Sequence, residues 1–129
     1  MIAKEFEEFL LSHLDHYLVP AEDLAIFIDT HNSDHAMLLL ANNGYSRVPV
    51  ITKDKEYVGT ISIADIMSYQ ANNQLTDWEL AQTDIGKMVN TKLQTISNTS
   101  SLTDIMHLLV DYPFLPVLDK NNHFLGIIT

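Results

Sequence analysis

The segment "GYSRVPVI" (residues 44–51) decides how the chain is organised. It begins with a glycine of the kind that ends helices, and it carries Arg47, the only arginine of the chain. It also has Pro49 inside an otherwise apolar, β-branched run. Proline has no N–H to donate, so we expect this one at the start or edge of a strand. The pattern becomes informative because it occurs a second time.

The second copy lies 67 residues further along the chain, where Leu115-Pro116-Val117 aligns with Val48-Pro49-Val50. Other anchors share this offset without a gap: Gly59 and Gly126, Ile61 and Ile128, Ser62 and Thr129, and the helical segments 34–40 and 101–107. Several anchors at one offset indicate an internal repeat. Each copy is too small to be stable alone, so we expect both to pack around a shared core in one α+β body.

Both copies predict the same order of elements: strand, helix, strand, turn, strand, helix. The first copy is read from "DLAIFI", a helix capped by Ser33 and ended by Gly44, "RVPVI", the turn "KDKE", "YVGTIS" and a helix capped by Ser62. The second is read from "LQTIS", a helix capped by Ser101, "LPVL", "DKNN" and "HFLGII". We therefore divide the chain into an N-terminal helix (1–17), a first repeat (18–72), a polar connecting segment (73–83) and a second repeat (84–129).

Composition excludes several classes of protein. The 129 residues are 47% hydrophobic, which is enough for a core, and carry a net charge of −10. Such an acidic chain lacks the basic face that binding to nucleic acid or to an anionic membrane requires. It has no cysteine, no apolar run of membrane-spanning length and no cationic start typical of a secretory signal. We expect a soluble cytoplasmic protein.

Catalytic and metal-binding motifs are not found in the sequence. It has no nucleophile elbow, P-loop or glycine-rich dinucleotide fingerprint, so we expect no enzyme and no cofactor. His31 and His35 have the i, i+4 spacing of helical metal ligands, but Asn32 and Ser33 indicate that His31 precedes the helix. We therefore expect no metal site.

A hydrophobic-Pro-Val strand, a glycine in the next strand and then Ser-x-x-Asp ("SIAD", residues 62–65) together resemble the CBS (cystathionine beta-synthase) domain. Two such repeats form a Bateman module. The run "GYSRVPVI…YVGTIS" with the N-terminal helix is most similar to small stand-alone two-repeat CBS proteins of Firmicutes, some of which bind cyclic di-AMP. The resemblance implies a pseudo-symmetric pair of tandem repeats, preceded by a helix.

The resemblance also implies a function. The protein would be a non-catalytic adenine-nucleotide sensor that binds cyclic di-AMP in the cleft between the repeats, forms a homodimer and regulates an unknown partner protein. AMP, ADP or ATP is the alternative ligand. A dimerisation or protein-interaction module with a degenerate site is the alternative function.

Each candidate site residue has a structural interpretation beside the functional one. "SIAD" is a capping box, yet a hydroxyl and a carboxylate at a helix start can also bind ribose. Arg47 is either a solvated surface residue or a planar donor for phosphate, and Lys92 is a second cation for the same purpose. The resemblance implies a site formed by Ala21, Leu24, Ala25, Tyr45, Ser46, Arg47, Val48, Pro49, Ser62, Asp65 and Thr129.

The two repeats differ at these positions. Pro113 and Phe114 replace Ser46 and Arg47, which predicts one nucleotide site per chain, unless Phe114 simply fills core. The sequence given stops at Thr129, where the second Ser/Thr-x-x-Asp motif would begin. The resemblance implies an aspartate and a closing helix beyond this point, so ligand binding by this form is left open.

Overall fold

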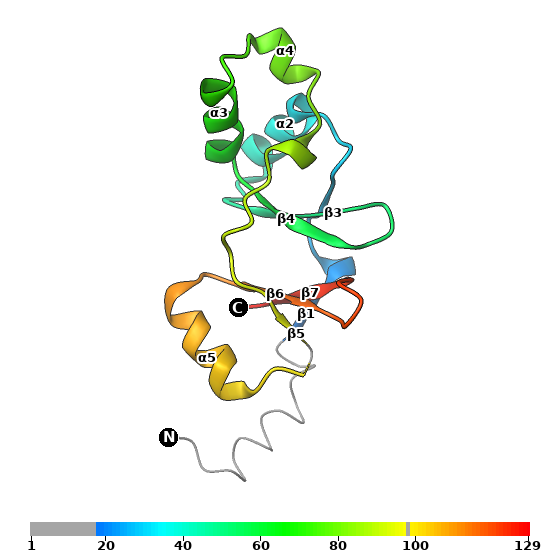
Figure 1. The fold of residues 1–129 in the computed structure, drawn as a ribbon, viewed down its shortest axis with the longest axis vertical. Helices are drawn as coiled ribbons and strands as arrows, with labels where there is room; N and C mark the ends of the chain where they lie inside the picture. Colours follow the sequence, from blue (N-terminus) through cyan, green and yellow to red (C-terminus); the bar gives the residue numbers. More distant parts are fainter. Residues whose placement is uncertain (1–17, 98) are drawn as a thin grey trace. The chain divides into compact units, whose positions relative to one another are not determined.

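The computed structural model describes residues 18–97 and 99–129, which form two compact units (Figure 1). The central unit consists of residues 25–92. The second, here called the flanking unit, joins residues 93–129 to the segment that ends at Leu24. The N-terminal helix expected over residues 1–17 lies outside the described residues.

The central unit contains a three-stranded sheet in the order β2-β3-β4, with helices packed against it (Figure 1). Its strands are β2 (Phe27–Ile28), β3 (Val48–Ile51) and β4 (Tyr57–Ile61), and its helices are α2 (Ser33–Asn43), α3 (Ile63–Asn72), α4 (Asp77–Ala81) and the 3-10 turn η3 (Ile85–Lys87). β2 runs parallel to β3, and β4 runs antiparallel to it. The core is formed by side chains from every layer, including Leu40, Ile61, Ile66 and Ile85.

The flanking unit contains a four-stranded sheet in the order β1-β7-β6-β5 and the helix α5 (Leu102–Asp111). Its strands are β1 (Leu18–Pro20), β5 (Ile96–Ser97), β6 (Leu115–Leu118) and β7 (Phe124–Ile128), and the 3-10 turn η2 (Ala21–Asp23) follows β1. Ile105 of α5 packs with Ile96, Leu115, Val117 and Ile128 of the sheet.

The strand register confirms the repeat predicted from the two proline motifs. Val48 pairs with Ile61 in the central unit, and Leu115 pairs with Ile128 in the flanking unit. The register shifts at the same place in both hairpins, directly after Val50 and directly after Val117. The equivalent hairpins therefore share one geometry, and the mixed α and β architecture is confirmed.

Pro49 lies within the central strand of its sheet and not at an edge, which corrects the expectation. It is tolerated because its partner Thr60 directs both backbone groups away from β3: Thr60 N donates to Asn90 O over 3.0 Å, and Asn90 N donates to Thr60 O over 2.7 Å. On the other side, β2 pairs with β3 only from Val50 onward. The missing N–H of Pro49 therefore faces no acceptor of the ladder.

Gly59 and Gly126 occupy equivalent positions and each admits a backbone segment across its strand. A Cβ on Gly59 would lie 2.9 Å from Asn90 O, and a Cβ on Gly126 would lie 2.2 Å from Val19 O. Gly126 also has a φ of 149°, which side-chain-bearing residues rarely adopt. The two glycines therefore explain how residues 89–90 reach β4 and how β1 reaches β7.

The start of α2 differs from the prediction. Asn32 is the N-cap and accepts from His35 N, whereas the expected cap, Ser33, is buried and donates its hydroxyl to Leu80 O. A hydroxyl stabilises the fold more when it donates to a buried carbonyl than when it caps an exposed helix start. Ser62 and Ser101 cap α3 and α5 as predicted, and Gly44 ends α2 in the left-handed conformation as predicted.

The remaining differences concern length. "DLAIFI" and "LQTIS" form strands of only two residues each, β2 and β5. The segment expected to be a polar connection contains α4, which begins with a capping box between Thr76 and Glu79. Within residues 18–97 and 99–129, no helix combines the length and apolar character needed to cross a membrane.

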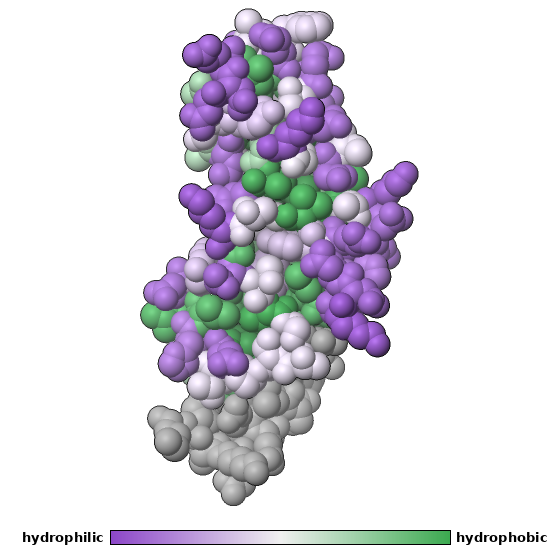
Figure 2. All heavy atoms as spheres, viewed as in Figure 1, coloured by the Kyte–Doolittle hydropathy of each residue, from purple (hydrophilic) through white to green (hydrophobic). Residues whose placement is uncertain are grey.

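The surface seen in Figure 2 is mostly hydrophilic, with hydrophobic residues in separate areas. The large apolar side chains that are exposed in the central unit include Leu38 on α2, Ile63 and Met67 on α3, and Trp78 on α4. In the flanking unit, Met106 and Val110 are exposed on α5.

Candidate functional site

Arg47 lies directly before β3 and is bound to three side chains of the central unit. Its Nη1 donates to Asp65 Oδ2 over 2.8 Å and to Thr60 Oγ1 over 3.0 Å, and its Nη2 donates to Ser62 Oγ over 3.4 Å. The exposed fractions of the Arg47 and Asp65 side chains are 26% and 16%. The arginine is therefore not a free surface residue: it forms a partly buried ion pair at the start of α3.

Asp65 fills the N3 position of the capping box predicted from "SIAD". Its Oδ2 accepts from Ser62 N and from Ser62 Oγ, each over 3.0 Å, while Asp65 N donates to Ser62 Oγ over 3.2 Å. The local sequence explains this geometry because a Ser-x-x-Asp start satisfies free helix N–H groups. Oδ1 faces Asn90, whose Nδ2 lies 3.4 Å away. We call Arg47, Thr60, Ser62, Asp65 and Asn90 the Arg47–Asp65 network.

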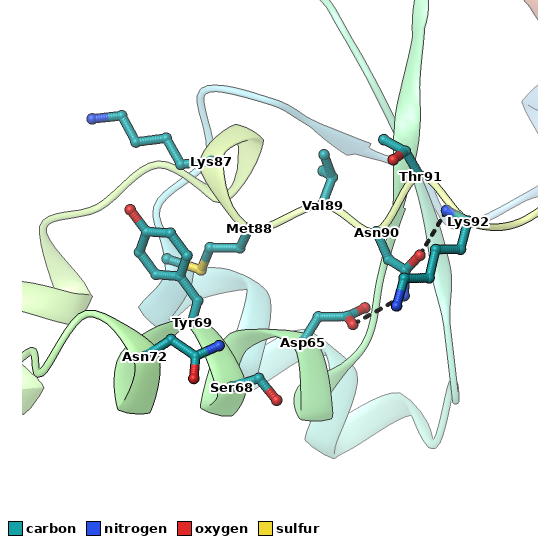
Figure 3. Close-up of a pocket in the computed structure, with 10 residues that line it drawn as sticks. All are labelled: Asp65, Ser68, Tyr69, Asn72, Lys87, Met88, Val89, Asn90, Thr91 and Lys92. Atoms are coloured by element: carbon teal, nitrogen blue, oxygen red, sulfur yellow. Dashed lines mark hydrogen bonds between the residues drawn. The ribbon is translucent and has the colours of Figure 1, made fainter.

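A hollow of about 320 Å³ opens beside this network, between α3 and the segment 87–92 (Figure 3). Asp65, Ser68, Tyr69 and Asn72 line it from α3, and Lys87, Met88, Val89, Asn90, Thr91 and Lys92 line it from the other side. Lys87 and Lys92 are exposed and bring two of the seven basic residues of the chain to one place. An acidic protein thus offers a polar hollow with local positive charge.

Tyr57, on β4, is neutral at physiological pH. Burial raises its pKa from the ordinary 10.0 to about 12, and the nearby Arg47 offsets part of this rise. The charges of Arg47 and Asp65 therefore compensate each other, and the phenol adds none.

The structure brings three of the predicted site residues together: Arg47, Ser62 and Asp65. Val48 and Pro49 are buried in β3, and Tyr45 and Ser46 are exposed in the loop before it. Ala25 is half-buried and packs against the core of the same unit. Ala21, Leu24 and Thr129 belong to the flanking unit, where Ala21 opens η2 and Thr129 follows β7.

Sequence reasoning missed Thr60, Asn90 and the hollow lined by Tyr69. Alternation along β4 offered a signal for Thr60, because residues 60 and 62 point to the same face of a strand. Nothing near Asn90 in the sequence indicates that it meets Asp65, since the two are joined only by the path of segment 89–90 across β4.

His31 and His35 pack edge to face with ring centroids 5.5 Å apart, and Phe27 lies on the other side of His31, 6.2 Å away. In the part of the chain that the structure describes, no three His, Cys, Asp or Glu residues gather closely enough to hold a metal ion. In the flanking unit, Phe114 is half-buried at the position equivalent to Arg47. That unit therefore lacks the guanidinium of the Arg47–Asp65 network.

Comparison with known protein families matches residues 21–72 and 84–129 to the CBS domain. The chain belongs to the CBS-domain family. This confirms the pair of CBS repeats inferred from the proline motifs. A comparison with curated proteins found no match.

Solved structures of CbpB proteins are similar to the whole chain. The CbpB protein of Streptococcus agalactiae is 73% identical with a TM-score of 0.93, and the alignment covers 99% of this chain and 81% of that one. A CbpB protein in complex with c-di-AMP is 72% identical with a TM-score of 0.91, covering 98% and 84%. The CbpB protein of Listeria monocytogenes, also in complex with c-di-AMP, is 32% identical with a TM-score of 0.81, covering 91% and 88%.

Proposed function

We propose that this chain is a non-catalytic sensor of adenine nucleotides that binds cyclic di-AMP at the Arg47–Asp65 network. Two similar CbpB structures hold this nucleotide, one of them at 72% identity. The observation that carries the proposal is the meeting of Arg47, Ser62 and Asp65 beside a polar hollow. These are the residue types that ribose and phosphate require.

Each group of the ligand has a chemical counterpart in the central unit. The Asp65 carboxylate accepts hydrogen bonds and suits a ribose hydroxyl, while the Arg47 guanidinium suits a phosphodiester. The Tyr69 ring offers an apolar face to a purine base, and Lys87 and Lys92 offset the negative charge of the ligand. The proposed site is completed by residues assigned from the family resemblance: Ala21, Leu24, Ala25, Tyr45, Ser46, Val48, Pro49 and Thr129.

The sensor acts through linkage in this proposal. A ligand that binds one arrangement of the protein more tightly shifts its affinity for a regulated protein by the same free energy. No reaction is needed.

Isothermal titration with cyclic di-AMP, AMP, ADP and ATP tests the proposal. Asp65→Ala is expected to weaken the binding of the preferred ligand by more than about tenfold, because it removes a charged hydrogen-bond acceptor. Asp104→Ala is the matched control, since Asp104 occupies the same position after its capping serine in "SLTD" but lies in the flanking unit. If no nucleotide binds the wild-type chain, the proposal of a nucleotide sensor is wrong, and a protein-interaction module is favoured.

We also propose that the chain forms a homodimer through its helices. Leu38 on α2 and Met67 on α3 are 59% and 50% exposed, which is unusual for large apolar side chains on two packed helices. Sedimentation of the wild type and of Leu38→Glu tests this: we expect a dimer that the charged substitution dissociates. A wild-type monomer at micromolar concentration would contradict the proposal.

A further inference from the structure

We propose that Arg47 makes the site selective for ligands that present a phosphate beside a ribose hydroxyl, because it must exchange its partner from Asp65 to the ligand. This inference rests on the proposed function and adds a specificity-determining step to it. A nucleoside without phosphate is rejected, since it can release Arg47 from Asp65 but cannot replace the lost carboxylate.

Arg47 is fully engaged by the protein itself. Its two terminal nitrogens reach one carboxylate and two hydroxyls at 2.8 to 3.4 Å, from Asp65, Thr60 and Ser62. Both members of the ion pair are largely withdrawn from water. A guanidinium in this position has to leave Asp65 before it can bind a phosphate in a bidentate way with both terminal nitrogens.

Asp65 Oδ2 has little room for another donor. It already accepts from Arg47 Nη1, from Ser62 N and from Ser62 Oγ, at 2.8, 3.0 and 3.0 Å. Ser62 N is fixed as the N-cap of α3, and Ser62 Oγ is held beside Asp65 by the bond that it accepts from Asp65 N. Arg47 is the one donor on a flexible side chain, so a ribose hydroxyl that approaches Oδ2 displaces Arg47.

A partly buried guanidinium that loses its carboxylate is left with two neutral hydroxyls, and truncating one side of such a pair is costly. A phosphodiester next to the ribose restores an anionic partner, and the hydroxyl replaces the donor that Asp65 lost. Both charges are then satisfied only by a ligand that carries both groups.

A competing arrangement makes the inference testable. Among residues 18–97 and 99–129, the one donor to Asp65 Oδ1 is Asn90 Nδ2, and that distance is 3.4 Å. A ribose hydroxyl that used Oδ1 would leave the ion pair intact, and Arg47 would then be a static support. In that case adenosine and AMP would respond alike to the loss of Arg47.

The experiment is a titration of adenosine, AMP and cyclic di-AMP into the wild type, Arg47→Met and Lys87→Met. We expect Arg47→Met to weaken the binding of AMP and cyclic di-AMP by at least about tenfold. It should strengthen the binding of adenosine, because Asp65 is then free of its arginine partner. Lys87→Met is the matched control: it removes a cation from the same hollow without touching Asp65, so it should weaken only the phosphate-bearing ligands.

Outcomes for the two proposals are distinct. If the wild type binds cyclic di-AMP but Arg47→Met weakens adenosine or leaves it unchanged, the partner exchange is wrong and the sensor stands. If the wild type binds no nucleotide, the sensor itself is wrong.

A second measurement needs no variant. Because the chain has a single arginine, its guanidinium gives one assignable set of NMR signals. We expect these signals to shift when cyclic di-AMP saturates the protein. An unchanged Arg47 signal in the saturated complex would overturn the exchange.

Discussion

Replacing Gly126 with alanine is expected to detach β1 from its sheet. The new Cβ would lie 2.2 Å from Val19 O and 3.1 Å from the Cα of Pro20, both in β1. Real Cβ atoms do not approach carbonyl oxygens this closely, so the edge strand has to move by about 1 Å or more. The φ of 149° at Gly126 adds backbone strain, because alanine rarely adopts it.

The magnitude follows from these two terms. Holding a side-chain-bearing residue in such a backbone region costs about 1–3 kcal/mol. Each hydrogen bond lost between β1 and β7 costs a further net of about 0.5–1.5 kcal/mol. We therefore expect Gly126→Ala to lower the free energy of unfolding by about 3 kcal/mol or more, a large part of the roughly 5–15 kcal/mol of a typical domain.

Urea unfolding followed by far-UV circular dichroism measures this change. Gly44→Ala is the matched control: its φ is 69°, but nothing lies within 4 Å of the added Cβ, so it should cost only about 1–2 kcal/mol. Gly59→Ala isolates the steric contact from the backbone strain, since a Cβ there meets Asn90 O at 2.9 Å without a positive φ. Equal midpoints for Gly126→Ala and Gly44→Ala would refute the steric argument.

Three further predictions concern single side chains. Ser33→Ala should lower the free energy of unfolding by about 0.5–1.5 kcal/mol in the same urea assay, because it removes the buried hydrogen bond to Leu80 O, which still accepts from Thr83 N. Stability should fall as pH rises from 10 to about 12, since the unfolded chain ionises Tyr57 first, and Tyr57→Phe should reduce this fall in alkaline unfolding curves. The pKa of Asp119 lies below its ordinary 3.8, chiefly because it accepts the backbone N–H of His123, so its contribution is lost as pH falls through the acid range. In acid unfolding curves, the free energy of unfolding of Asp119→Asn should therefore fall less steeply with falling pH than that of the wild type.

The hairpins could be predicted because their information is local. Each has an apolar-Pro-Val strand, a charged or polar turn and a strand with glycine, and the two copies support each other. The capping box of α3 follows the same logic, since Ser62 and Asp65 are three residues apart and form their bonds within one turn. Local patterns of this kind do not depend on how the rest of the chain folds.

The cap of α2 could not be predicted, because Asn32 and Ser33 are both good caps. The choice depends on Leu80, 47 residues away from Ser33, whose carbonyl takes the serine hydroxyl. The constant offset of the repeat also fails here: the N-caps Asn32 and Ser101 differ by 69 residues, whereas the strands differ by 67. A gap-free alignment cannot represent this change.

The ion pair of Arg47 and Asp65 was missed although both residues were candidates. The pairing of Val48 with Ile61 sets Arg47 across from Ser62 and brings it within reach of Asp65. That register depends on the irregularity after Val50, which the residue types do not reveal. The single arginine and the "SIAD" motif made the cation and the carboxylate candidates, and only the strand register shows that they bind each other.

The pairing of β1 with β7 has a consequence for how the protein is made. Leu18 pairs with Ile128, so the sheet of the flanking unit needs residues that precede and residues that follow the central unit in the sequence. During synthesis, β1 is made early and has to wait until residues 126–128 are made before it can pair with β7. Residues 25–92 are continuous and can complete their own contacts in the meantime. The newborn chain can therefore form its arginine–aspartate pair before it closes the sheet of the flanking unit.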